Sequence, residues 1–423
     1  MISRFDTHVL APTAAPQREP ILDVLRGFAI LGILLVNIQF MRSAEWMVST
    51  GGDSQADSGL TADKVAQFVI GWLASGKFLS SLAILFGIGA ALIAVRSLAA
   101  GSSPRPLLAR RYGWLLPFGL AHMLLLYPGD ILFVYGVTGL MLLAFVNLRP
   151  VAIMLWAAVI FTAYTLGAVR LARLFSYGAS SQYYDEAATA PWDDALYELH
   201  AKAVAAFTQG SYGDVVAVHA SQALTLQGYQ FSALPWILAL FLIGYAAGRT
   251  GVLDDIAAYR PMLRRGAIIG LSVGLPANIA VGFGGPLGAY AGTVDPHATG
   301  ILVAAALGQA LGAPLLAIGY LCALSLYCLR HGPIRPLAAV GRMALTAYLL
   351  QSALALAVIA GLRLYDQLST SASLLVVAGV WAVLLVACPL WLSRFQFGPV
   401  EWLWRSLTYG RLQPMRVRAG SNA

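Results

Sequence analysis

The chain has 423 residues, of which 59% are hydrophobic and 11% are charged. A soluble fold needs more polar surface than this composition provides, so the sequence indicates an integral membrane protein whose main partner is the lipid bilayer. The formal net charge is +8, but the basic residues form short clusters between apolar runs rather than a continuous basic face. This pattern fits the positive-inside rule, and we expect no nucleic acid as a partner.

Runs of apolar residues long enough to cross a bilayer of about 30 Å recur along the whole chain. They lie at 22–41, 68–95, 110–127, 131–148, 151–169, 233–250, 266–285, 299–329, 338–362 and 372–393. The sequence therefore predicts an all-α fold, a polytopic integral membrane helical bundle of about ten transmembrane helices. The second run is counted once, because Lys77 at mid-span would cost about 3 kcal/mol, and an interfacial or re-entrant turn is expected around it.

The distribution of basic residues predicts the orientation of the bundle. Of the 27 Lys and Arg residues, twenty fall in segments expected inside. The seven expected outside are Arg42, Lys64, Lys77, Arg170, Arg173, Lys202 and Arg363. The positive-inside rule then places both termini in the cytoplasm.

This orientation divides the chain into regions. Residues 1–21 are expected to form a cytoplasmic N-terminal tail, and the following apolar run is too long for a signal-peptide core, so we interpret it as an uncleaved first span. Residues 22–393 form the transmembrane domain, and residues 394–423 form a basic cytoplasmic C-terminal tail. Within the domain, the acidic segment 170–231 is expected to be a periplasmic insertion with one or two amphipathic surface helices.

Cysteines and common enzyme motifs give no sign of a metal or nucleotide-fold site. Cys322, Cys328 and Cys388 lie in apolar runs, and their odd number and wide spacing match neither a metal site nor a disulfide framework. No P-loop, nucleophile elbow, zincin motif or dinucleotide fingerprint occurs in a suitable context. We therefore predict no metal site.

Two sets of polar residues near the predicted cytoplasmic face are candidates for binding an anion. Asp23 and Arg26 are three residues apart and share one helix face, which predicts either an interfacial salt bridge or an element that binds an anionic group. A cluster of arginines follows the second run and either reflects topology alone or binds the phosphates of a nucleotide-like donor. Its members are Arg96, Arg105, Arg110 and Arg111.

The segment 119–132 carries the strongest catalytic signal. Pro128 and Gly129 predict a tight turn between two spans, with His122 shortly before it and Asp130 directly after it. The two side chains can therefore approach each other, and a carboxylate beside an imidazole orients it as a general base. The alternative is a structural histidine in an apolar helix. Asn37, near the far end of the first span, either bonds a neighbouring helix or belongs to the same site.

Several motifs along the chain together resemble the YeiB family, a bacterial inner-membrane family classed as a domain of unknown function. They are LDVLRGFAILGILLVN at 22–37, FGIG at 86–89, the segment from His122 through GDIL at 129–132, GRMALTAYLLQS at 341–352 and GPVEWLWRSLTYG at 398–410. This resemblance implies a multi-pass protein of the bacterial inner membrane.

The opening D-x-x-R-G signature, followed by an apolar helix ending near an asparagine, is also similar to that of the transmembrane acyltransferase superfamily, including the lysosomal heparan N-acetyltransferases. Those enzymes move an acyl group from cytosolic acyl-CoA to an acceptor across the membrane, and Asn37 matches a functional asparagine of that group. Their histidine soon after this asparagine has no counterpart in residues 41–67. The resemblance therefore requires His122 to supply the base from another helix.

Two functions follow from these observations. The first is an acyltransferase in which Asp23, Arg26, Arg96, Arg110 and Arg111 hold acyl-CoA as co-substrate, while His122, Asp130 and Asn37 act on a membrane or periplasmic acceptor. The second is a transporter or flippase for a small or lipid-like solute, with the glycine-rich stretches 282–288 and 308–312 as moving parts. A scaffold role is a third alternative, and a homo-oligomer is compatible with the sequence.

Overall fold

The computed structural model describes residues 20–44, 61–180, 186–252, 255–283 and 299–416, and its secondary structure there is helical apart from one isolated bridge. The N-terminal half contains α1 (Pro20–Met41), α2 (Ala62–Leu73), α3 (Lys77–Ala99), α4 (Arg105–Gly113), α5 (Leu115–Leu125), α6 (Leu132–Leu142), α7 (Pro150–Ser180), α8 (Glu186–Thr208) and α9 (Tyr212–Ser232). The C-terminal half contains α10 (Leu234–Gly248), α11 (Arg260–Ala277), α12 (Ile279–Gly282), α14 (Thr299–Leu307), α15 (Ala313–His331), α16 (Arg335–Arg342), α17 (Ala344–Gly361), α18 (Thr370–Leu392) and α19 (Pro399–Tyr409), with short turns η3 (Ile256–Tyr259) and η4 (Gly308–Gly312).

The protein is a polytopic helical membrane protein. Among the described residues, six helices or continuous helix pairs are long and apolar enough to cross a bilayer, and the bent pair of α9 and α10 would make seven. The sequence predicted about ten. The three runs 110–127, 131–148 and 266–285 account for the difference, because they form α5, α6 and α11 rather than long, uniformly apolar helices.

Prolines explain several of the breaks. A proline inside a helix has no N–H to donate and its ring clashes with the carbonyl of the preceding turn. Pro117 follows the break between α4 and α5 at Trp114, and Pro235 follows the 54° bend between α9 and α10. Pro314 follows the π-helical turn η4. An apolar run that looks continuous in sequence is therefore divided into shorter helices.

The two turns predicted from local sequence are present. α2 ends before Gly76, whose φ of 78° lies in the left-handed region, and α3 begins at Lys77. The Lys77 ammonium is buried and donates to the carbonyl of Gly71 at 2.8 Å. Pro128 and Gly129 form the turn between α5 and α6.

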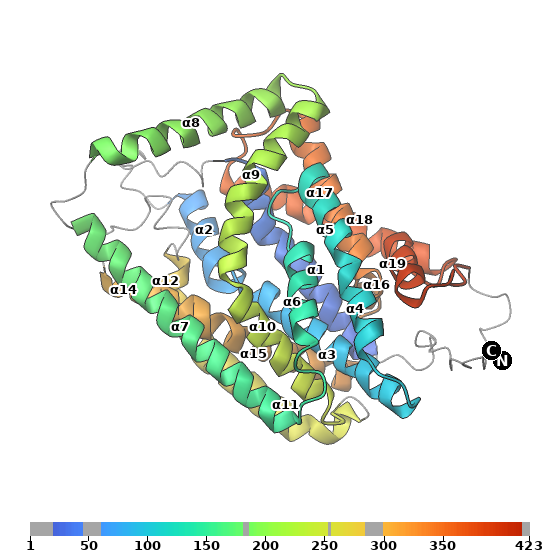
Figure 1. Cartoon of the computed structure of the whole chain (residues 1–423). Coiled ribbons are helices and arrows are strands. Elements are labelled where there is room, and N and C mark those ends of the chain that lie inside the picture. Colours follow the sequence, from blue (N-terminus) through green and yellow to red (C-terminus); the bar gives the residue numbers. More distant parts are fainter. Residues whose placement is uncertain (1–19, 45–60, 181–185, 253–254, 284–298, 417–423) are drawn as a thin grey trace, which may run out of the picture.

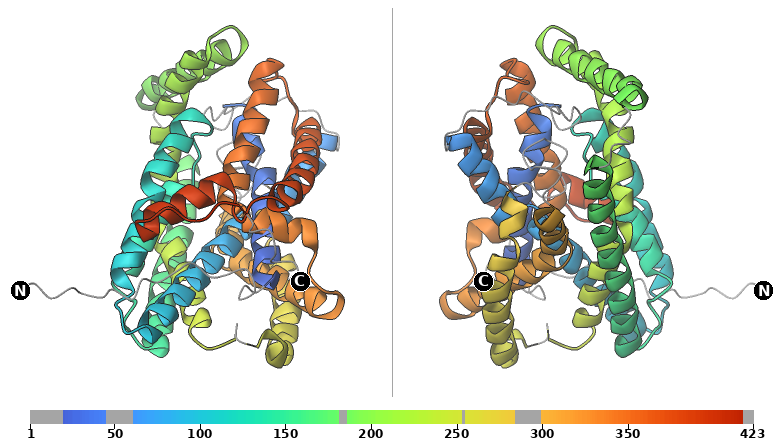
Figure 2. Two further views of the ribbon diagram at one scale, coloured as in Figure 1. Left: turned by 90° about the vertical axis from the view of Figure 1, so that its right-hand side faces the viewer. Right: turned by 90° about the vertical axis from the view of Figure 1, so that its left-hand side faces the viewer.

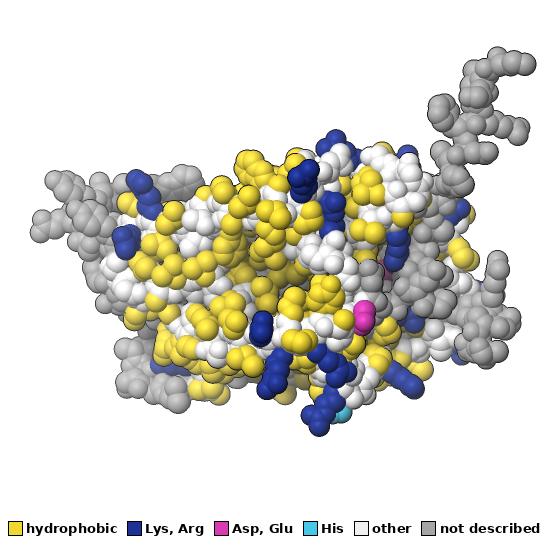
Figure 3. All heavy atoms as spheres, turned by 90° about the horizontal axis from the view of Figure 1, so that it is seen from below, with side chains coloured by type: hydrophobic (Ala, Val, Ile, Leu, Met, Phe, Trp, Pro, Cys, Tyr) yellow, Lys and Arg dark blue, Asp and Glu magenta, His cyan; other side chains and the backbone are white. Residues whose placement is uncertain are grey.

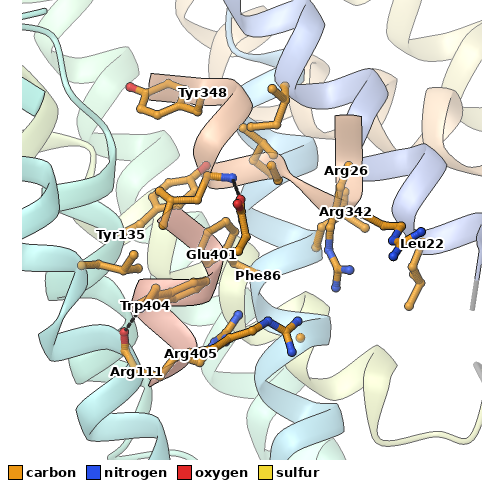
Figure 4. A pocket seen from close by; sticks show the side chains of 18 of the residues that line it. Leu22, Arg26, Phe86, Arg111, Tyr135, Arg342, Tyr348, Glu401, Trp404 and Arg405 are labelled. Carbon is orange, nitrogen blue, oxygen red and sulfur yellow. Dashed lines mark hydrogen bonds between the residues drawn. The ribbon is translucent and has the colours of Figure 1, made fainter. Parts of the chain in front are cut away.

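Close helix crossings bring the polar ends of α1 and α16 together. Gly27 of α1 faces the backbone carbonyl of Leu337, and Gly341 of α16 faces the backbone carbonyl of Asp23. A side-chain carbon at either glycine would overlap backbone atoms that cannot rotate away. This crossing places Arg26 and Arg342, which neighbour these glycines, on the same side of the bundle (Figure 4).

The acidic segment 170–231 contains the end of α7, all of α8, and α9 up to its last residue but one. α8 lies across one end of the bundle, as Figure 1 and both views of Figure 2 show. α9 begins with a capping box in which Ser211 and Asp214 bond each other's backbone N–H groups, and it packs along α5. α19, in contrast, lies near the middle of the bundle and runs across it (Figure 2).

Candidate functional site

A cavity of about 440 Å³ opens between α1, α3, α4, α5, α6, α16, α17 and α19 (Figure 4). One end of it is strongly basic. Five arginines line the cavity together with two carboxylates, a formal excess of three positive charges among the described residues. The arginines are Arg26, Arg96, Arg111, Arg342 and Arg405, and the carboxylates are Asp23 and Glu401.

The predicted pairing of Asp23 with Arg26 is confirmed. Arg26 Nη1 donates to Asp23 Oδ1 at 3.1 Å, within the first two turns of α1. The Asp23 side chain is 8% exposed and the Arg26 side chain 29% exposed, so the guanidinium keeps access to the cavity. The pair therefore compensates the buried carboxylate and leaves part of the Arg26 fork available to a ligand.

Aromatic rings hold two other arginines in place. The Arg111 guanidinium lies 3.9 Å from the centroid of the Trp404 ring, and the Trp404 indole N–H donates to the Arg111 carbonyl at 2.8 Å. The Arg405 guanidinium lies 4.7 Å from the centroid of Phe397. Ring faces attract cations without neutralising them. The ring contacts thus fix the orientation of both guanidinium groups without themselves neutralising them.

Glu401 has a different role, because its carboxylate caps another helix. Its Oε1 accepts the backbone N–H groups of Leu345 and Thr346, and its Oε2 accepts the Thr346 hydroxyl at 2.5 Å. These N–H groups belong to the first turn of α17 and have no partner within that helix. Burial raises the pKa of the Glu401 carboxyl, and the hydrogen bonds from Thr346 and Leu345 oppose that rise.

The rest of the cavity wall is apolar and aromatic. Leu82, Leu85 and Phe86 come from α3, and Tyr135 and Tyr348 come from α6 and α17. Figure 4 places Tyr348 far from Arg111 and Arg405, so the basic end and the aromatic end lie apart. A cavity of this kind suits a ligand with an anionic head and an apolar chain.

The predicted His122–Asp130 contact is also present, behind the aromatic end of the cavity. His122 Nδ1 lies 2.7 Å from Asp130 Oδ1, and both side chains are 0% exposed. With Asp130 as the acceptor, a neutral His122 ring carries its proton on Nδ1 and a lone pair on Nε2. Within the described part of the chain, Nε2 has no hydrogen-bond partner.

Neighbouring groups fix this pair. Asp130 Oδ2 accepts the Phe133 backbone N–H at 2.7 Å, at the start of α6. The Tyr348 ring lies 4.7 Å from the His122 ring, and the Tyr348 hydroxyl accepts the Ile131 N–H at 3.4 Å. Tyr348 lines the cavity while His122 does not. The tyrosine therefore separates the histidine from the cavity.

Helix α9 covers the same turn from the other side. Gln227 Nε2 donates to the Asp130 carbonyl at 3.0 Å, and Gln230 Nε2 donates to the Gly129 carbonyl at 2.9 Å. The Tyr212 hydroxyl donates to the Leu125 carbonyl at 2.6 Å. These bonds satisfy carbonyls that the end of α5 and the turn leave unpaired.

The structure brings together some of the predicted site residues and not others. Asp23, Arg26, Arg96 and Arg111 line the cavity, whereas Arg110 is exposed outside it. Asn37, His122 and Asp130 are buried and do not line it.

The sequence interpretation did not assign Arg342, Tyr348, Glu401, Trp404 or Arg405 to the site. Arg342 and Tyr348 stood out as polar groups inside a span, and the other three lie in the quoted motif at 398–410, in a segment expected to be a tail. That motif concentrates tryptophans and charges in an amphipathic helix, which was the available signal.

Known proteins resemble this chain over most of its length. A family model described as "Protein of unknown function (DUF418)" matches residues 247–411. "Uncharacterized protein YxaH" of Bacillus subtilis is 30% identical, covering 96% of this chain and 98% of that protein. "Uncharacterized protein YeiB" of Escherichia coli is 30% identical, covering 93% of this chain and 96% of that protein. No solved structure matches the chain.

The capping role of Glu401 predicts a loss of stability in Glu401→Ala. The substitution leaves two backbone N–H groups of α17 and the Thr346 hydroxyl without their acceptor, which should cost about 2 kcal/mol. We expect a lower melting temperature of the detergent-purified protein. Glu198→Ala is the matched control, because that carboxylate is 67% exposed and pairs with Lys202 on the surface of α8. Equal melting temperatures of the two variants would contradict the capping role.

Proposed function

This chain belongs to the DUF418 family and is homologous over its full length to YeiB and YxaH, and we propose that it is a membrane-embedded acyltransferase. It takes an acyl group from cytosolic acyl-CoA and transfers it to a membrane or periplasmic acceptor. The observation that carries this proposal is a single cavity with arginines at one end and an aromatic wall at the other, with the buried His122–Asp130 pair directly behind that wall.

The shape and charge of the cavity support acyl-CoA as the donor. Its phosphates match the planar, multi-donor guanidinium groups of Arg26, Arg111 and Arg342, which bind phosphate oxygens in pairs. The acyl chain fits the apolar wall, where it is removed from water. Neither part of the donor alone explains both ends of the cavity.

His122 supplies the base in this mechanism. Its Nε2 accepts the proton of the acceptor hydroxyl or amine while the acceptor oxygen or nitrogen bonds to the thioester carbonyl carbon. The carbon–sulfur bond then breaks, and the CoA thiolate takes the proton from Nε2. Asp130 keeps the ring in the required tautomer and stabilises the imidazolium that forms between the two steps. Tyr348 has to move for the two substrates to meet His122.

We infer an orientation in the bacterial inner membrane with both termini in the cytoplasm. The broken helix formed by α4 and α5, the short helix α6, α11, and the bent pair of α9 and α10 bring the membrane segments to about ten. The face opposite α8 carries many Lys and Arg side chains and few acidic ones (Figure 3), as the positive-inside rule expects for the cytoplasmic side. α8 and the start of α9 then lie in the periplasm.

Labelling of single cysteines tests this orientation. In a variant without the three native cysteines, Gln209→Cys between α8 and α9 should react with a membrane-impermeant maleimide added to spheroplasts. Arg264→Cys on α11 should react only after the membrane is permeabilised. Both native side chains are exposed, so access to the reagent depends on the side of the membrane. The reverse labelling pattern would reverse the orientation.

Adjacent arginines provide a test of donor binding. Arg111 lines the cavity and Arg110 does not, so Arg111→Gln should weaken binding of octanoyl-CoA by about 10- to 100-fold, the effect of one charge-assisted contact. Arg110→Gln should change Kd less than about twofold. Isothermal titration in nanodiscs measures both. Equal Kd values for the two variants would exclude this cavity as the donor site.

Substitution of His122 tests the chemical step. His122→Gln should reduce transfer of the labelled acyl group from octanoyl-CoA to the membrane or periplasmic fraction by about 10²- to 10⁴-fold, while Kd for octanoyl-CoA stays the same. His331→Ala is the control, because that histidine is exposed at the end of α15. Unchanged transfer in His122→Gln would remove this residue from the mechanism. Binding without any transfer by the unmodified protein would instead favour transport.

A further inference from the structure

Among the described residues, eight buried side chains have nitrogen or oxygen atoms without a hydrogen-bond partner, and three of them lie on the neighbouring helices α1, α5 and α17. They are the Asn37 Nδ2 on α1, the His122 Nε2 on α5, and both amide atoms of Gln351 on α17. Asn37 is 7% exposed, His122 is 2% exposed and Gln351 is 0% exposed. Buried polar groups are nearly always paired in native proteins, and an unpaired one costs about 1–3 kcal/mol. Their presence together needs an explanation.

Along its own helix, each of the three residues lies between residues that line two different pockets. A second, much smaller pocket of about 10 Å³ lies toward α8 and α9 and is lined by Phe40, Met41, Leu126, Tyr127, Pro128, Phe207, His219, Gln222, Leu356 and Tyr365. Helix α1 lines the large cavity up to Ile30 and the small pocket from Phe40, and Asn37 lies between them.

The same order holds on the other two helices. On α5, Leu115 lines the large cavity and Leu126, just after its end, lines the small pocket, with His122 between them. On α17, Tyr348 lines the large cavity and Leu356 lines the small pocket, with Gln351 between them.

Helix geometry puts the three residues in one layer. At about 1.5 Å per residue, Asn37 lies about 6 Å from Met41 along α1, and His122 lies about 6 Å before Leu126. Gln351 lies about 7.5 Å from Leu356 along α17. α1 packs against α17, and His122 contacts Tyr348 of α17, so the three helices are neighbours. The three residues therefore lie at similar heights in the bundle, in one layer between the two pockets.

We propose that Gln351 binds the carbonyl oxygen of the transferred acyl group in this layer. The inference rests on the acyltransferase function proposed above and adds a binding residue to it. The Gln351 Nε2 carries two N–H donors, and attack on the thioester makes the carbonyl oxygen negative until the carbon–sulfur bond breaks. An amide donor stabilises that charge without taking part in the proton transfer that His122 performs.

The hydrogen bonds in the described part of the chain give the buried amide of Gln351 no structural role. Neighbouring Ser352 is equally buried, yet its hydroxyl donates to the Tyr348 carbonyl at 3.3 Å and is satisfied. Gln351 makes no such bond in the described part of the chain. An apolar side chain of similar size would fill the same space at lower cost, so the amide is expected to serve a ligand.

A pair of non-reactive donors isolates the carbonyl contact. S-(2-oxononyl)-CoA and S-nonyl-CoA differ only by the carbonyl oxygen. In Gln351→Met, which keeps the side-chain volume, Kd for the ketone should rise by about 3- to 10-fold, as for one lost hydrogen bond, while Kd for the thioether changes less than twofold. Ser352→Ala is the control and should change neither value. If Gln351→Met does not fold, Gln351→Leu replaces it.

Each result has a distinct meaning. If both analogues bind and the substitution affects them equally, or affects neither, Gln351 does not bind the carbonyl and the inference fails while the donor cavity stands. If the unmodified protein binds neither analogue, the proposed acyltransferase function fails and the inference fails with it. A selective loss for the ketone supports the assignment.

Discussion

The start of α17 depends on a carboxylate supplied by another helix. Glu401 of α19 accepts two backbone N–H groups and the Thr346 hydroxyl there, in a position with little access to water. Without that acceptor, the first turn of α17 would expose unpaired donors in an apolar setting. The position of α17 in turn decides where Tyr348 and Gln351 lie. The same bond holds α19, and with it Trp404 and Arg405, against the cavity.

Charge and apolar surface meet in the cavity because aromatic rings support two of its arginines. Trp404 and Phe397 present ring faces to the guanidinium groups of Arg111 and Arg405, and Asp23 pairs with Arg26. Positive charge that is partly removed from water costs free energy unless an anion binds beside it. These features are the ones that the acyl-CoA donor proposed above would use, with phosphates at the basic end and an apolar chain at the aromatic end.

The His122–Asp130 pair is rigid for a similar reason. The carboxylate bonds both the imidazole and the backbone of α6, while Gln227 and Gln230 hold the turn from the side of α9. These bonds fix both the carboxylate and the turn that carries it. Among the described residues His122 Nε2 has no hydrogen-bond partner, and the ring lies beside a tyrosine that lines the cavity. In the proposed mechanism, proton transfer therefore requires that tyrosine to move.

The sequence by itself determined the membrane class, the family, the break before Lys77, and the contacts of Asp23 with Arg26 and of His122 with Asp130. The family follows from motifs spread over residues 22–410, and the others depend on composition or on residues at most eight positions apart, where helix and turn geometry fix the distance. Only the tertiary structure decided that α19 completes the cavity and that Arg110 is excluded from it. Glu401 reaches a helix start 55 positions away, and adjacent arginines differ only in which side of α4 they occupy. Contacts between residues so far apart produce no periodic pattern of apolar residues, because nearly all segments of this chain are apolar.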